Sequence, residues 1–542
     1  MKKLNPYVAL FLIALAFRVG TALPLQQAGY MDAAYTMHIA EQLARGRGFV
    51  EEVLWNYLDN PAGLPHPSNV YWMPLSSLLI APLFVLFGAS YRVAQIPFIF
   101  LSALLPVFAF YLSRKIFSRD PERQAKGYAW SAALFTLFSG FYTIYWVSPD
   151  NFTVFAITGS ITLFLIARGI EESGRANADK FFFLAGIFAG LSHLARADGI
   201  LFLVIAPIAF TFFAIRNSDR VSRIAPRVLR LTFFSALGYL LIMLPWFARN
   251  TITFGALFPI GGAKTLWLTH YDELFRFTDD LTPARYFAWG LEGIVGSKVN
   301  AAIQNAFILA FSSLVFFLAP FSFIGWWKTR QHIYHLPITI YLILLYLVMT
   351  LGFTFPSWRG SLFHSASALA PFFAITAPLG IDASVEWIAR RRRAWNLREA
   401  TQVFRFGFVI LAALFSVYLY AQAIWGASSG VIPLWNQRDA HYTPIARWLD
   451  QNARADDLVM VVDPPMFYTV SHRRAIVIPT ENVDALFIAA RKYNARYVIV
   501  EFDHPRPFSD LYNERVTVPG LKRVADFRDA LNRPAFVFEI VP

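Results

Sequence analysis

The amino-acid sequence predicts an all-α polytopic membrane protein with a small α/β domain at its C-terminus. Of its 542 residues, 56% are hydrophobic and only 15% are charged, whereas a soluble domain carries nearer to about 25% charge. Apolar runs recur from Tyr7 to about Trp425, and each approaches the ~20 residues that an α-helix needs to cross a bilayer. The pattern changes after residue 431, where short mixed segments replace the long apolar runs.

Basic residues cluster in short loops between the apolar runs, and this clustering predicts the topology. Cytoplasmic loops of membrane proteins carry an excess of Lys and Arg. We therefore expect a cytoplasmic N-terminus, and the net charge of +13 does not indicate nucleic-acid binding. The basic segments are Lys2-Lys3, 114–126, 216–230, 328–330 and 390–405.

About 11 transmembrane helices place every basic loop on the cytoplasmic side. Segments 26–91 and 249–300, and everything after about residue 426, then become extracytoplasmic. The apolar segment 74–89 breaks this parity if it crosses, and it is short for a crossing, so we interpret it as a re-entrant or interfacial helix on the outer face. The predicted spans are 7–25, 92–113, 127–147, 150–168, 181–195, 198–215, 231–248, 301–323, 336–354, 363–388 and 404–424.

The sequence divides into a transmembrane domain, residues 1–425, and a C-terminal domain, residues 431–542. Helical and strand-like patterns alternate in the second part, which predicts an extracytoplasmic soluble α/β domain. The chain has no cysteine, which excludes disulfides and thiolate metal sites. The predicted helices are 444–452 and 484–493, and the predicted strands are 458–462, 497–501 and 536–541.

Asp32 lies just outside the first span, near the start of a predicted helix over 36–45. An acid at this position is explained by helix capping and by the helix dipole. It is equally explained as a general base held at the membrane surface, where a lipid headgroup arrives. Spacing alone leaves both interpretations open.

The first outer loop resembles that of the GT-C superfamily glycosyltransferases, in particular the protein O-mannosyltransferase and lipid A aminoarabinose transferase-like group. The resemblance is carried by Asp32, Tyr35, Ala40–Gly48, His66-Pro67 and Met73-Pro74-Leu75, and it extends over roughly residues 1–390. It implies a GT-C-like fold, Asp32 as catalytic base, and a polyprenyl-phosphate sugar donor used on the outer face. Mannosyltransferases tend to have two prolines before a lysine where this chain has His66-Pro67-Ser68, so the sugar and the acceptor stay open.

Asp150 is a second candidate acid, at the predicted outer start of a span. Pro149 followed by an acid is ordinary helix-start chemistry, but family members carry an aspartate at the corresponding position. The donor phosphate needs cations, and the candidates at outer helix ends are Arg196, Arg249, Arg359 and Lys264. Each has a structural alternative, such as an Arg196–Asp198 pair or a Trp-Arg interfacial anchor at Arg249. Tyr35, His66 and His364 are candidates for binding the acceptor or the sugar.

These observations predict a membrane-bound hexosyl- or pentosyltransferase of the cell envelope, acting by inversion. Its partners are a polyprenyl-phosphate-linked sugar, membrane lipids, and a glycan, lipid or protein acceptor, as in protein glycosylation. No cofactor is expected, since acids and histidines near the first loop show no tight metal-ligand spacing. The alternative is a transporter or flippase of lipid-linked sugars, which predicts internal repeats and midplane charges that the sequence does not show.

Overall fold

The computed structural model describes residues 5–175, 177–217, 221–313, 315–392, 395–426 and 434–541. Lys2, Lys3, Arg393 and most of the predicted boundary between residues 425 and 431 lie outside these ranges. The chain forms two compact units, each discontinuous in sequence. Unit 1 comprises Met1–Ala22, Ile96–Arg249 and Ser297–Tyr420, and unit 2 comprises Leu23–Gln95, Asn250–Gly296 and Ala421–Pro542. The predicted division into residues 1–425 and 431–542 stays a prediction.

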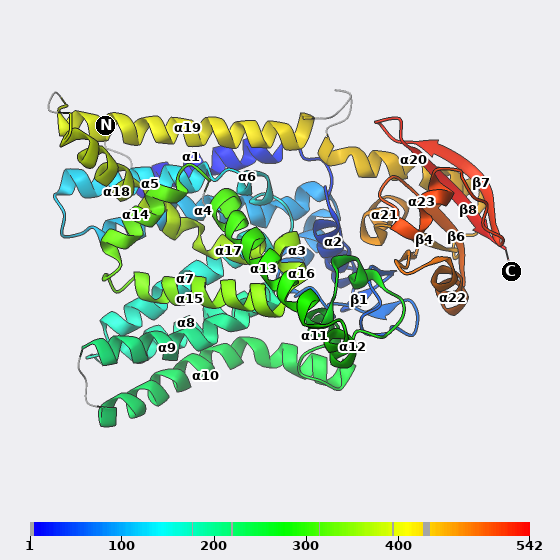
Figure 1. Cartoon of the computed structure of the whole chain (residues 1–542), viewed down its shortest axis with the longest axis horizontal. Helices are drawn as coiled ribbons and strands as arrows, with labels where there is room; N and C mark the ends of the chain where they lie inside the picture. Colours follow the sequence, from blue (N-terminus) through cyan, green and yellow to red (C-terminus); the bar gives the residue numbers. More distant parts are fainter. Residues whose placement is uncertain are drawn as a thin grey trace. The chain divides into compact units, whose positions relative to one another are not determined.

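Unit 1 is built from helices (Figure 1). Within the described residues, nine helical stretches of the chain are long and apolar enough to cross a membrane, and Pro6–Ala22 and Leu75–Phe87 are shorter apolar helices. The predicted polytopic membrane fold is confirmed. The helices of this part of the chain are α1 (Pro6–Ala22), α4 (Tyr91–Ile116), α5 (Glu122–Leu137), α6 (Tyr142–Tyr145), α7 (Asn151–Glu171), α8 (Ala178–Ala195), α9 (Leu201–Arg216), α10 (Val221–Phe254), α13 (Leu291–Phe307), α14 (Ala319–Thr329), α15 (His335–Leu347), α16 (Thr354–Pro356), α17 (Leu362–Ala366), α18 (Ala370–Ala389) and α19 (Leu397–Trp425).

Two predicted spans differ from the structure. The span 127–147 ends at Leu137, because the chain turns at Gly140, where φ is +60° and a glycine is favoured. The span 301–323 is divided, since helical structure from α13 ends at Ser313 and α14 begins at Ala319. Pro320 occupies the first turn of α14, where its missing N–H costs nothing. A prediction based only on hydrophobicity joins such segments into one span.

Helices α14 and α18 approach closely because each has a glycine at the contact. A Cβ atom on Gly380 would lie 1.8 Å from the Phe321 carbonyl oxygen, and one on Gly325 would lie 1.9 Å from the Thr376 carbonyl oxygen. Small residues at such contacts allow backbones to pack tightly, which is how helices associate in lipid.

Unit 2 contains a six-stranded sheet in the order β2-β5-β4-β6-β8-β7. The strands β2, β5, β4 and β6 are parallel, while β8 is antiparallel to both β6 and β7. Figure 1 shows β4, β6, β8 and β7 side by side. The strands are β2 (Val53–Leu54), β4 (Leu458–Val461), β5 (Ala475–Val477), β6 (Ala495–Val500), β7 (Leu521–Arg528) and β8 (Pro534–Ile540).

The loop formed by residues 45–74 is part of this sheet. Val53 and Leu54 pair with Ala475 and Ile476, so a strand from the beginning of the chain extends a sheet formed by its end. The same loop forms a small hairpin-like pair, β1 (Val50–Glu51) with β3 (His66–Pro67). Unit 2 also contains the helices α2 (Met31–Ala44), α3 (Leu75–Phe87), α20 (Gln437–Asn452), α21 (Pro464–Ser471) and α22 (Val483–Tyr493).

Candidate active site

Asp32 lies in the first turn of α2, in unit 2. The helix begins at Met31, earlier than the predicted start, and the backbone of Tyr30 before it is extended. The first N–H groups of a helix have no partner within it, and they and the helix dipole stabilise a negative charge. The start of α2 is therefore a favourable place for a carboxylate.

Tyr35 and His66 both contact Glu51, a buried acid for which no role was predicted from the sequence. The Tyr35 hydroxyl donates to Glu51 Oε2 at 2.6 Å and accepts from the backbone N–H of Asn69 at 2.8 Å. His66 Nδ1 lies 3.3 Å from Glu51 Oε1, and His66 Nε2 lies 3.0 Å from Asp59 Oδ2. The adjacent Glu51 and Glu52 in an otherwise apolar and aromatic stretch were the available signal.

The charges of this cluster follow from burial and pairing. Burial raises the pKa of the Glu51 carboxyl. Burial also disfavours the charged form of His66, but hydrogen bonds to Asp59 and Glu51 outweigh it and raise the pKa of His66 to about 9. His66 is therefore an imidazolium at neutral pH, held between two acids.

This pairing predicts a pH-dependent contribution of His66 to stability. Because its folded pKa of about 9 exceeds its ordinary value of 6.5, the contribution is complete below pH 6.5 and is lost as the pH rises through 9. Its size is roughly 3 kcal/mol. The melting temperatures of the wild type and His66→Gln, measured from pH 6 to 10, should differ most at pH 6 and converge above pH 9. A difference that does not depend on pH would contradict the assignment.

Asp150 caps α7 in unit 1. Its Oδ1 accepts from the N–H of Asn151 at 2.5 Å, so the helix-start role considered for this residue is present. Its Oδ2 also lies 3.8 Å from Nδ1 of His364, which comes from α17. A carboxylate and an imidazole are the ligand types that divalent cations accept. That no metal is required stays a prediction.

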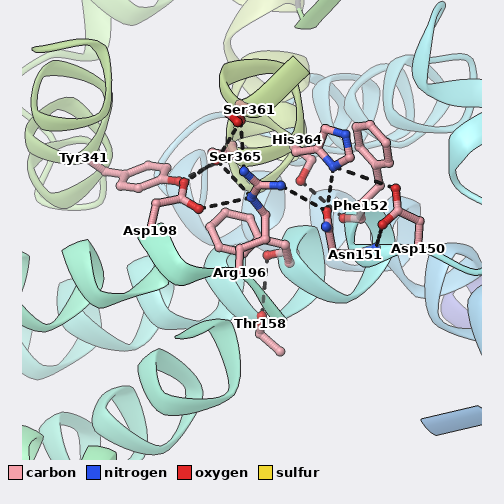
Figure 2. Close-up of polar contacts among 12 residues, drawn as sticks. Asp150, Asn151, Phe152, Thr158, Arg196, Asp198, Tyr341, Ser361, His364 and Ser365 are labelled. Carbon is pink, nitrogen blue, oxygen red and sulfur yellow. Dashed lines mark hydrogen bonds and ion pairs between the residues drawn. The ribbon is translucent and has the colours of Figure 1, made fainter. Parts of the chain in front are cut away.

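Asn151 connects His364 with Arg196, as Figure 2 shows. His364 Nδ1 lies 2.7 Å from Asn151 Oδ1, and the same oxygen accepts from Arg196 Nη1 at 3.5 Å. Because an amide oxygen only accepts, His364 donates through Nδ1. The ring of His364 stacks on Phe152, with 3.7 Å between the ring centroids, so its orientation is fixed.

Arg196 follows α8 and is the centre of this cluster. Its Nε donates to Asp198 Oδ1 at 3.0 Å and lies 3.2 Å from the Ser365 hydroxyl, and its Nη2 lies 3.4 Å from the Ser361 carbonyl oxygen. The Arg196–Asp198 pair considered from the sequence is therefore present. Ser365 also donates to Asp198, and Tyr341 donates to the Ser365 carbonyl oxygen.

The structure thus brings Asp150, Arg196 and His364 together through Asn151. No role was predicted from the sequence for Asn151, Ser361 or Ser365. Ser361 and Ser365 are four residues apart and share a helix face, but serines at this spacing are too common in helices to indicate a site.

The other predicted phosphate ligands make contacts of a different kind. The Arg249 guanidinium lies 4.8 Å from the centroid of the Trp246 ring, and Arg359 lies 4.7 Å from that of Trp358. The Trp-Arg contact considered for Arg249 is therefore present. Lys264, in unit 2, pairs with Asp279 at 2.5 Å.

Solved structures with this fold are known. ArnT from Cupriavidus metallidurans bound to undecaprenyl phosphate is 13% identical, with a TM-score of 0.58 over 98% of this chain and 98% of that chain. The same protein in the apo state, also 13% identical, gives 0.57 over 98% and 97%. The Archaeoglobus fulgidus oligosaccharyltransferase tethered with an acceptor peptide is 17% identical and gives 0.53 over 92% and 69%. No protein-family model matches the sequence, and no curated protein matches it. The similarity extends over most of the chain and confirms the predicted GT-C-like fold.

Proposed function

We propose that this chain is an integral membrane glycosyltransferase that moves a sugar from a polyprenyl-phosphate donor to an acceptor on the extracytoplasmic face. The observation that carries the proposal is the similarity of the fold over 98% of both chains to a protein bound to undecaprenyl phosphate. The placement of Asp32 in the first turn of a helix that follows an apolar helix supports the same conclusion.

The proposed reaction inverts the anomeric centre. Asp32 takes a proton from an acceptor hydroxyl or amine, and the resulting nucleophile forms a bond to the anomeric carbon. The bond between that carbon and the phosphate oxygen breaks, and the electron pair leaves with the polyprenyl phosphate. The acceptor proton ends on the Asp32 carboxylate.

The leaving phosphate carries the negative charge that develops, so the proposal assigns its stabilisation to cations. Arg196, Arg249, Arg359 and Lys264 are the candidates, and Asp150 orients the acceptor or a basic partner. Arg196 has the strongest support, because its guanidinium is mostly buried, with 13% of its side chain exposed, and oriented by four neighbours. Tyr35, His66 and His364 are proposed to bind acceptor or sugar, and the apolar segment 74–89 the lipid chain.

A donor-fate experiment tests this function against lipid-linked sugar transport. Mass spectrometry of envelope glycans and lipids from a deletion strain identifies the missing product. Proteoliposomes containing the purified chain are then given the corresponding polyprenyl-phosphate sugar and acceptor. We expect release of sugar-free polyprenyl phosphate together with glycosylated acceptor. Movement of intact donor between leaflets, with no cleavage of the sugar–phosphate bond, would instead establish a flippase and refute the transferase.

A further inference from the structure

Unit 2 contains a pocket of about 410 Å³ that the proposed reaction does not use. Its volume lies within the range of about 300–1,000 Å³ that is typical of small-molecule sites. The wall comes from residues that follow α2, from the loop between α20 and β4, from α21, and from the segment that leads into β5. The charged or titratable groups among the described lining residues are Arg45, Arg47, Arg474, His472, Glu52, Asp456 and Tyr468.

The three arginines of the wall are accessible to a ligand and have unused donors. The side chains of Arg45, Arg47 and Arg474 are 44%, 51% and 46% exposed. Among the described residues, Arg474 donates only through Nε and Arg47 only through Nη1. Arg45 donates only through Nη2, to Glu41 Oε1 at 2.6 Å. The other N–H groups of each guanidinium can therefore donate to a ligand in the pocket.

Glu52 positions two of these arginines. It is 8% exposed, and it accepts from Arg474 Nε through Oε2 at 2.7 Å and from Arg47 Nη1 through Oε1 at 3.4 Å. The pair with Arg474 follows from the strand register, because Val53 pairs with Ala475 and the residues before them lie side by side. A buried acid thus orients the two guanidiniums, so less side-chain entropy is lost when a ligand binds.

The chemistry of the wall selects a phosphate group. Arginine binds phosphate oxygens through two parallel hydrogen bonds. A phosphate monoester carries about −1.5 to −2 charge on three acceptor oxygens, so more than one guanidinium can donate to it. A carboxylate has only two oxygens, which one bidentate arginine occupies. A cation is disfavoured, because the arginines repel it and Glu52 is already paired with two of them.

We infer that this pocket binds a phosphate monoester group, at a site separate from that of the donor phosphate. Arg45, Arg47 and Arg474 donate to the phosphate oxygens. Arg45 follows Asp32 by 13 residues, at the C-terminal end of α2, which corresponds to a rise of about 20 Å. A phosphate in the pocket is therefore too far from Asp32 to be the group that leaves with the polyprenyl chain. The inference does not rest on the proposed function, because phosphate binding requires no transfer.

Binding to the full-length protein in phosphatidylcholine nanodiscs, without donor or acceptor, tests the pocket. The probes are inorganic phosphate and D-glucose 6-phosphate, with acetate and D-glucose as comparisons, and isothermal titration calorimetry gives Kd. We expect both phosphates to bind at least about tenfold more tightly than acetate, and D-glucose not to compete with them. Arg45→Gln and Arg47→Gln should each weaken phosphate binding about tenfold. No phosphate binding, or an unchanged Kd in both variants, would overturn the inference.

Two further variants separate this pocket from the general positive charge of the chain. Arg496→Gln is the matched control: Arg496 is 45% exposed and lies 3.0 Å from Glu539, but it does not line the pocket, so binding should be normal. Asp456→Asn removes an exposed acid from the wall and should strengthen phosphate binding about two- to fivefold, a gain that unfolding cannot produce. Weaker binding in Asp456→Asn, or the same loss in Arg496→Gln as in Arg45→Gln, would refute the site.

A change of lipid identifies the source of the phosphate group. Nanodiscs with phosphatidic acid, a phosphate monoester, are compared with nanodiscs containing phosphatidylglycerol, which is an anionic diester. If a lipid headgroup occupies the pocket, phosphatidic acid alone raises the apparent Kd of D-glucose 6-phosphate, and Arg47→Gln removes the difference between the two lipids. Equal Kd values in the two lipids assign the pocket to a phosphate carried by a soluble molecule or a glycan. Either result supports the site.

Discussion

Replacing Asp32 with asparagine is expected to lower kcat by about 10²–10⁴-fold, the range that a positioned general base contributes. Asparagine has nearly the shape of aspartate but accepts no proton at neutral pH. The KM for the donor should change little, because the lost interaction is made only as the acceptor proton is transferred. Single-turnover transfer by the purified variant, measured over a range of donor concentrations, checks the expected rate and the expected KM. The melting temperature, measured in parallel, shows whether the variant is folded.

A matched substitution isolates the helix contribution of such an acid. Asp484 lies in the first turn of α22, as Asp32 lies in that of α2, and both helices belong to unit 2. An acid in the first turn stabilises a helix by about 0.3–1 kcal/mol, so Asp32→Asn and Asp484→Asn should lower stability by similar small amounts. Only Asp32→Asn should lower transfer by about 10²–10⁴-fold. If it transfers sugar at the wild-type rate, Asp32 is a helix-start acid and nothing more.

Much of the fold could be predicted because the length of apolar segments and the positions of basic loops can be found along the sequence without knowledge of tertiary contacts. The break between α13 and α14 could not, since Ser313 and Ala319 lie within one continuous apolar run. The strand Val53–Leu54 could not be predicted either. It is two residues long, and it is a strand only because it pairs with Ala475 and Ile476, so no local pattern identifies it.

The charged residues of the candidate site could be predicted from the sequence, but its neutral polar residues could not. Arg196 and Asp150 were found because charged residues near a membrane span are costly. Asn151 bonds to both of them, and Ser365 bonds to Arg196, but neutral polar residues are common in helices of such bundles and carry no signal in sequence. Glu51 was missed because its role depends on Tyr35 and His66, 16 and 15 residues away.

Arg196→Leu is expected to destabilise unit 1 by about 3–5 kcal/mol, because it leaves the Asp198 carboxylate buried without its cation. The two side chains are 13% and 10% exposed, and their atoms are 3.0 Å apart. The double variant Arg196→Leu/Asp198→Leu should recover most of the melting temperature, since no lone charge stays buried. Its transfer rate should still be at least about 10²-fold below wild type, as expected when a group that stabilises developing charge is lost.

A second buried pair in the same unit provides the control for Arg196. Arg405 Nε lies 3.0 Å from Asp382 Oδ1, both side chains are 13% exposed, and Arg405 is in a segment predicted to be cytoplasmic. Arg405→Leu should therefore cost similar stability yet leave the transfer rate per folded molecule close to wild type. Thermal unfolding and the transfer rate, normalised to folded protein, are measured for all three variants. Recovery of transfer together with stability in the double variant would show that Arg196 only closes the turn after α8, and that the donor phosphate binds elsewhere.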